Sequence, residues 1–237
     1  LSVSPDEQKQ AAADAALDYI EDGMRLGLGT GSTAARFVDV LGAKVAAGLN
    51  VLCVPTSRAT ETRANQLGIP LTTLAETPEL DLTVDGADEL DDKLSLIKGG
   101  GGALLREKIV ATSSKRMIVI ADASKLVETL GRFPLPVEVI PFGHESTRRK
   151  IKAASFACGC EGDIVLRLRD GEPFVTDNAN LIYDCHFGRI EDAETLAQLL
   201  SSIAGVADHG LFIRTADLAL IGTPDGLKTI KVDKWSR

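Results

Sequence analysis

The first half of the chain alternates between segments with a helical spacing of apolar residues and short runs that are apolar throughout. The spacing predicts helices from Ser4-Pro5 to about residue 22, from about Ser32 onward, over residues 58–68 and over residues 103–114. The apolar runs predict strands at residues 24–28, 50–57, 69–74, 80–85 and 116–122. Strands alternating with helices of this length are typical of βαβ units, so we expect a mostly parallel, Rossmann-like sheet.

The pattern changes after a proline-rich stretch, Arg132 to Phe142. The segments that follow predict a β-α-β-β-α-β order, which is the ferredoxin-like signature: strand 137–141, helix 144–157, strand 163–169, strand 180–187, helix 192–204 and a strand near 211–214. A hairpin around Thr223-Pro224-Asp225-Gly226 ends the pattern. The sequence therefore predicts an α/β protein with a smaller ferredoxin-like α+β lid domain inserted near the C-terminus. The expected domains are 1–131 with 210–237, and 132–209.

Composition narrows the class of protein. With 44% hydrophobic and 25% charged residues, the 237-residue chain is of the ordinary globular type. A net charge of −8 argues against general binding of nucleic acid or of anionic membranes, but not against a small anionic substrate. The N-terminus carries no signal-peptide pattern, and no apolar run approaches the roughly 18 residues of a membrane span, so we expect a cytoplasmic protein. The four cysteines and three histidines form no metal or redox motif, which predicts inert free thiols and no metal site.

Three glycine-containing loops follow predicted strands, where ligands bind in open α/β sheets. The first, "GLGTGSTAA", satisfies the dinucleotide fingerprint with Gly29, Gly31 and Ala34. That fingerprint also requires an acidic residue at the end of the next strand, where this chain has Pro55-Thr56-Ser57. The loop is therefore better explained as a phosphate site, because Ser32 and Thr33 begin a helix and offer hydroxyl and amide groups.

The second and third loops carry the candidate acids and bases. Asp85 and Asp88 stand at a strand end around Gly86; alternatively, they form an Asx-turn in which Asp88 caps a helix. Lys98 precedes four consecutive glycines, which form either a ligand loop or a linker. Glu107 follows one helical turn later, on a face shared with alanine, leucine and valine, and no lysine or arginine lies three or four residues away. It faces either solvent or a cavity; in a cavity its pKa would rise, as suits a general base.

Six segments in chain order resemble one enzyme family, the type A ribose-5-phosphate isomerases: "GLGTGSTA", "VDGADE", "IKGGGGALLREK", "IADASK", "FPLPVEV" and "ALIGTPDG". The matches run from Met24 to Lys228. The resemblance implies interconversion of ribose 5-phosphate and ribulose 5-phosphate in the non-oxidative pentose phosphate pathway, without metal or organic cofactor. It implies a homodimer or homotetramer.

The resemblance also implies site residues. The family's glutamate base matches Glu107, and its substrate-binding stretches match Thr30, Gly31, Ser32, Thr33, Asp85, Gly86, Ala87, Asp88, Lys98, Gly99, Gly100, Gly101 and Lys125. Lys9 is a further candidate for a phosphate contact. Aldose–ketose isomerisation needs ring opening and then proton transfer between C2 and C1 through a cis-enediolate. We expect Glu107 to move the proton, Asp85 to assist ring opening and Lys98 to stabilise the oxyanion.

Two other classes of protein fit parts of the pattern. One is a sugar-phosphate-sensing domain of a transcriptional regulator, which would lack the glutamate base and carry a DNA-binding helix pair. The other is a coenzyme A transferase, in which a glutamate in a different loop is a nucleophile and "VDGADE" has no role.

Overall fold

The computed structural model describes residues 3–232, which form two compact units. The first contains residues 3–87, 106–126 and 214–232, and the second contains residues 88–105 and 127–213. The expected division placed residues 88–105 in the first domain. They fall in the second unit because β4 (Glu89–Leu90) and β5 (Leu96–Ile97) form a three-stranded antiparallel sheet with β13 (Leu211–Phe212).

A six-stranded sheet organises the first unit, as the pattern predicted. Its order is β15-β14-β6-β3-β1-β2, and every neighbouring pair is parallel except β14 with β15. The strands are β1 (Arg25–Leu28), β2 (Leu52–Pro55), β3 (Leu82–Asp85), β6 (Met117–Asp122), β14 (Leu218–Thr223) and β15 (Gly226–Lys231). The predicted strand at 69–74 is wrong: Leu71 makes only an isolated bridge with Cys53.

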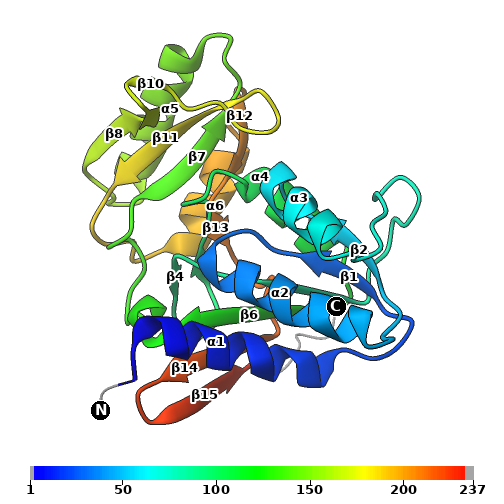
Figure 1. The fold of residues 1–237 in the computed structure, drawn as a ribbon. Coiled ribbons are helices and arrows are strands. Elements are labelled where there is room, and N and C mark those ends of the chain that lie inside the picture. Colours follow the sequence, from blue (N-terminus) through cyan, green and yellow to red (C-terminus); the bar gives the residue numbers. More distant parts are fainter. Residues whose placement is uncertain (1–2, 233–237) are drawn as a thin grey trace. The chain divides into compact units, whose positions relative to one another are not determined.

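Two helices, α1 (Pro5–Ala16) and α2 (Ser32–Ala46), pack side by side in this unit (Figure 1). Ser4 and Glu7 form a capping box at the start of α1, since Ser4 Oγ accepts the Glu7 N–H and the Glu7 carboxylate accepts the Ser4 N–H. The helix ends at Ala16, earlier than predicted, and continues as the 3₁₀ turn η1 (Leu17–Tyr19). Leu17 and Tyr19 pack against the core there, so tertiary contacts outweigh the helical pattern.

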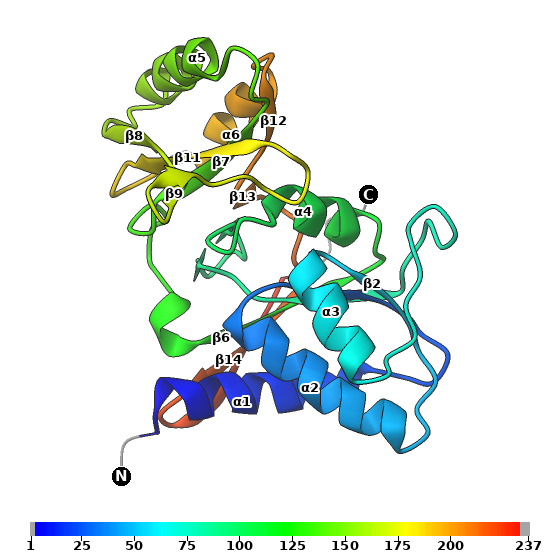
Figure 2. The same ribbon diagram turned by 45° about the horizontal axis from the view of Figure 1, so that its top comes forward.

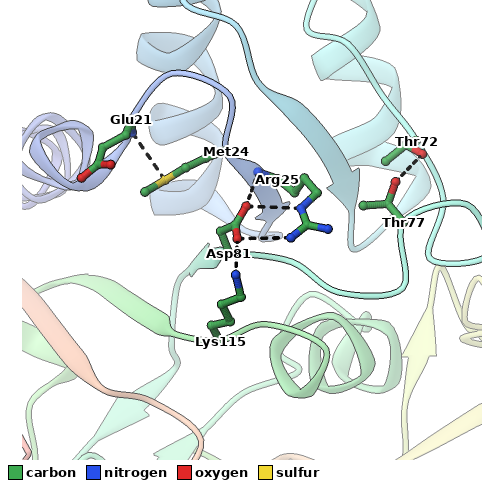
Figure 3. Close-up of polar contacts among 7 residues, drawn as sticks. All are labelled: Glu21, Met24, Arg25, Thr72, Thr77, Asp81 and Lys115. Carbon is green, nitrogen blue, oxygen red and sulfur yellow. Dashed lines mark hydrogen bonds and ion pairs between the residues drawn. The ribbon is translucent and has the colours of Figure 1, made fainter.

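Asp81 joins the amino ends of neighbouring strands in the sheet of the first unit (Figure 3). Its carboxylate accepts the backbone N–H of Arg25 at 2.9 Å, the Arg25 Nε at 3.3 Å and the Lys115 Nζ at 2.8 Å. The ammonium of Lys115 and then the groups of Arg25 hold the pKa of Asp81 well below its usual range. Asp81 thereby connects the beginnings of β1, β3 and β6.

The second unit contains the predicted ferredoxin-like fold. Its antiparallel sheet has the order β12-β7-β11-β8, the arrangement expected of a split βαβ unit. The strands are β7 (Leu135–Val139), β8 (Asp163–Leu166), β11 (Leu181–His186) and β12 (Val206–His209). The helices α5 (His144–Ala157) and α6 (Ala193–Ser201) cover one face (Figure 2), and β9 (Leu168–Arg169) pairs with β10 (Glu172–Pro173).

The last ferredoxin strand was misplaced by the prediction, which put it near 211–214. It ends at His209, and Gly210 carries the chain into the other sheet as β13. Gly210 donates its N–H to Pro136 O and accepts from Lys98 N, so it is bonded to both sheets. A Cβ at Gly210 would lie 2.8 Å from Pro136 Cδ and would also overlap Lys98 O, so a residue with a side chain does not fit.

Candidate active site

The first group of candidate residues lies where β1 and β3 end side by side. Asp85 is fully buried, and its Oδ1 accepts the backbone N–H groups of Thr30 at 3.1 Å and Gly86 at 2.7 Å. A Cβ on Gly29 would lie only 2.6 Å from Asp85 Cα. Glycine is therefore required at position 29 so that the "TGST" turn can approach the carboxylate.

Three hydroxyls that the sequence analysis missed hold this turn in place. Thr30 Oγ1 lies 2.7 Å from Thr56 Oγ1, 2.8 Å from Ser57 Oγ and 3.1 Å from Thr60 Oγ1. Thr56 and Ser57 follow β2, and Ser57 caps α3 (Arg58–Gln66). The sequence "PTS", which argued against a dinucleotide site, could have pointed to these hydroxyls, because it ends β2, the strand next to β1.

The amino end of α2 carries the candidate phosphate groups. Gly31 is its N-cap with φ at +118°, and it makes no side-chain capping bond. Ser32 is exposed and Thr33 is buried. Helix amino ends with uncapped amides attract anions, so the geometry favours a phosphate here.

Glu107 lies in the first turn of α4 (Leu104–Thr112) and is 3% exposed. Its helical neighbours Ala103, Val110 and Ala111 are also buried. This burial rules out the solvent-facing alternative. Placing a carboxylate among alanine and valine costs free energy, and such a cost is commonly retained where the group has a function.

The second group of candidates lies in the second unit. Gly100 donates its N–H to Asp88 Oδ2 at 2.7 Å, and Asp88 donates its own N–H to Ile97 O at 2.8 Å. The alternative in which Asp88 caps a helix is wrong, because β4 follows it. Lys98 is 2% exposed, its backbone N–H donates to Gly210 O at 2.9 Å, and its Nζ lies 5.5 Å from the centre of the Phe212 ring.

Lys125 ends the 3₁₀ turn η2 (Ala123–Lys125), which follows β6 in the first unit. Gln8 on α1 accepts the Ala123 N–H at 3.2 Å and so fixes this turn to the helix. Lys9, the next residue on α1, forms an ion pair with Asp6 at 3.7 Å.

Within residues 3–232, no cluster of three His, Cys, Asp or Glu side chains could hold a metal ion, and no helix is long and apolar enough to cross a membrane. The cysteines are free thiols; Cys158 is half-buried and the other three are buried. Burial raises the pKa of the Cys53 thiol to about 12.

Comparison with known proteins decides between the candidate classes. Residues 52–226 match the profile of the family described as ribose 5-phosphate isomerase A (phosphoriboisomerase A). The chain belongs to this family. The ribose-5-phosphate isomerase A of Parvibaculum lavamentivorans is 60% identical over 97% of this chain and 100% of the relative. That of Rhodopseudomonas palustris strain HaA2 is 57% identical over 97% of this chain and 99% of the relative.

Solved structures agree with the sequence relatives. The ribose 5-phosphate isomerase from Plasmodium falciparum superposes with a TM-score of 0.90 and 40% identity, covering 97% of this chain and 100% of that one. A D-ribose-5-phosphate isomerase in complex with phospho-erythronic acid gives a TM-score of 0.89 and 38% identity over the same shares. The chain is therefore an aldose–ketose isomerase that interconverts ribose 5-phosphate and ribulose 5-phosphate, and neither a regulator's sensing domain nor a coenzyme A transferase.

Proposed function

We propose that Glu107 performs the central step of this isomerisation by carrying a proton between C2 and C1 of the open-chain sugar. The observation that carries the proposal is the burial of this carboxylate, 3% exposed in the first turn of the helix after the glycine run. A proton that leaves C2 generates an enediolate, and its return to C1, together with transfer of the hydroxyl proton from O2 to O1, completes the change from aldose to ketose. One base suffices for both transfers.

Asp85 is proposed to assist opening of the furanose ring. Two backbone N–H groups converge on its Oδ1, which fixes the plane of the carboxylate. A fixed carboxylate can take the proton of the anomeric hydroxyl without a further entropic cost of orientation. As the C1–O4 bond breaks, the anomeric oxygen becomes the carbonyl oxygen and O4 takes up a proton. This role precedes that of Glu107 in the reaction.

Lys98 is proposed to stabilise the enediolate oxygen. Its side chain is 2% exposed, and a buried ammonium attracts a developing negative charge more strongly than an ammonium in water does. A positioned general base typically contributes about 10²–10⁴-fold to a rate, so oxyanion stabilisation has to supply much of the remainder.

The phosphate of the substrate is assigned to the amino end of α2, with Thr30, Gly31, Ser32 and Thr33, and to Lys125. The glycine at the N-cap supports this assignment, because it has no side chain to occupy the first amides of α2. The remaining candidates, which would bind the sugar hydroxyls through backbone groups and one carboxylate, are Gly86, Ala87, Asp88, Gly99, Gly100 and Gly101. We further propose a cytoplasmic homodimer or homotetramer.

The kinetics of Glu107→Gln test the proposal. The variant keeps the shape of the side chain and removes its basicity, so kcat should fall by about 10²–10⁴-fold with little change in KM. Wild-type turnover should persist in the presence of a chelator.

Glu138→Gln is the matched control. Glu138 is fully buried too, but it accepts hydrogen bonds from Thr176 and Asn180, both at 2.9 Å, within the ferredoxin-like sheet and its loops. Its replacement should lower the unfolding temperature and leave kcat per folded molecule intact. If Glu107→Gln behaves in the same way as this control, Glu107 is a structural residue and the proposal is wrong.

A further inference from the structure

Arg167 lies between β8 and β9 and contacts the glycine run that follows Lys98. Its Nη1 donates to the carbonyl oxygens of Gly99 at 2.9 Å and Gly100 at 3.2 Å. The other side of the guanidinium meets Asp184 on β11, with Nε at 2.9 Å from Oδ2 and Nη2 at 2.5 Å from Oδ1. Arg167, Asp184 and the glycines all belong to the second unit. None of the loop motifs pointed to this arginine.

We propose that Arg167 is a positioning residue for the isomerase reaction, which holds the glycine loop in the conformation that presents its N–H groups. The inference rests on the proposed role of Gly99, Gly100, Gly101 and Asp88 in binding the sugar. Arg167 does not contact the sugar in this proposal. It binds the carbonyl oxygens of the glycine peptides and so orients the N–H groups on their opposite side.

The geometry of the peptide bond explains how a contact on one side fixes the other. In a trans peptide the C=O and N–H groups point in opposite directions. Holding Gly99 O therefore directs the Gly100 N–H, which donates to Asp88 Oδ2 at 2.7 Å. Holding Gly100 O directs the Gly101 N–H in the same manner. A cation on the carbonyl oxygens also polarises these peptides, which strengthens their N–H groups as donors.

A run of four glycines needs such external contacts because its own backbone restricts it so little. The structure supplies such contacts at Gly99, Gly100 and Gly102. Arg167 holds Gly99 and Gly100, and the Phe174 ring lies where a Cβ on Gly102 would be. Asp88 occupies the other side of Gly100, where a Cβ would lie 2.6 Å from its Oδ1.

Arg167 is itself held rigidly. Its backbone N–H donates to Ile182 O at 2.8 Å, and its carbonyl accepts from Phe174 N at 2.9 Å. The two-bond pairing with Asp184 needs the planar fork of a guanidinium, which leaves Nη1 directed at the loop. Lysine has no such fork and cannot hold Asp184 and both carbonyls together.

The test compares Arg167→Gln with Arg169→Gln in the full-length enzyme. Arg169 is the matched control because it is an exposed arginine two residues further along the chain, with its guanidinium carbon 4.3 Å from the centre of the Phe174 ring. We expect Arg167→Gln to lower kcat by about 10–100-fold, as a loop displaced by about 1 Å would. Inhibition by inorganic phosphate should be unchanged, because Thr33 and Lys125 lie in the first unit.

Millimolar guanidinium should also restore part of kcat to Arg167→Ala, because the free cation can bind the same carbonyl oxygens. If the variant is inactive only because it is misfolded, guanidinium should restore no activity. The inference is overturned if Arg167→Gln keeps kcat within about threefold of wild type, if it weakens phosphate inhibition as much as it lowers kcat, or if Arg169→Gln loses as much activity. The kinetics of Asp88→Asn report separately on the proposed sugar-binding role of the loop, so the failure of that proposal and the failure of this inference are distinguishable.

Discussion

Gly29→Ala offers a test of how tightly the "TGST" turn must approach Asp85. The backbone at Gly29 has no positive φ, so alanine introduces no torsional strain there. The added methyl would lie 2.6 Å from Asp85 Cα and would overlap Asp85 Oδ1 as well. Carbon atoms pack at about 3.5–4.0 Å, so turn and strand end must separate by about 1 Å. The clash is with the backbone of Asp85, so a change of side-chain rotamer cannot relieve it. The Asp85 backbone therefore has to shift, and its carboxylate shifts with it.

Two measurable effects follow from that displacement. Overpacking of this kind costs about 1–3 kcal/mol of stability. Moving Asp85 by about 1 Å, with loss of the 3.1 Å bond from Thr30 N–H, should lower kcat by about 10²-fold. Thermal unfolding and steady-state turnover of ribose 5-phosphate measure the two effects on one preparation.

Gly42→Ala is the control for overpacking alone. Its Cβ would lie 2.9 Å from Leu67 Cβ, in the same unit but away from the strand ends. Its kcat should stay near that of wild type. The reasoning is refuted if Gly29→Ala keeps kcat within about threefold of wild type, or if Gly42→Ala loses as much activity.

Two further predictions concern the phosphate and the sheet. Replacing Thr33 or Lys125 by alanine should raise KM more than it lowers kcat, and unphosphorylated ribose should be a very poor substrate; similar kcat/KM for ribose and its phosphate would contradict the assignment. Asp81→Asn should cost about 1–2 kcal/mol at pH 7, because the charge that binds Arg25 and Lys115 is lost (Figure 3). Since the pKa of Asp81 is lowered by folding, its contribution is complete above the unfolded value near 4 and is lost as pH falls through the folded pKa. Denaturation curves should therefore show a constant difference between wild type and Asp81→Asn from pH 7 to pH 5 that shrinks in more acidic solution; a difference that persists unchanged there would refute the ion-pair account.

The helix starts and the order of helices and strands could be predicted from the sequence, because neighbouring residues determine them. The capping signal at Ser4 and the turn before Ser32 marked helix starts that the structure confirms. The β-α-β-β-α-β order predicted the ferredoxin-like unit, and helical geometry placed Glu107 beside alanines that the structure shows to be buried. These features depend on residues close together in the chain.

Features that depend on distant pairing were missed. β4 and β5 are two-residue strands, too short for any periodicity to reveal, and β5 pairs with β13, which is more than a hundred residues away. The same pairing displaced the last ferredoxin strand to Val206–His209. Arg167 lies in a predicted strand with no motif around it, and only the tertiary fold brings its guanidinium to the carbonyl oxygen of Gly99.

The most direct test of the central claim is the incorporation of solvent deuterium into the product. In D2O, a proton carried by Glu107 exchanges with solvent while it is held on the carboxylate, so ribulose 5-phosphate formed by the wild-type enzyme should contain deuterium at C1. Glu107→Gln should lose this incorporation in parallel with kcat, whereas Glu138→Gln should retain it. Undiminished incorporation by Glu107→Gln, or an equal loss of incorporation by Glu138→Gln, would contradict proton transfer through Glu107.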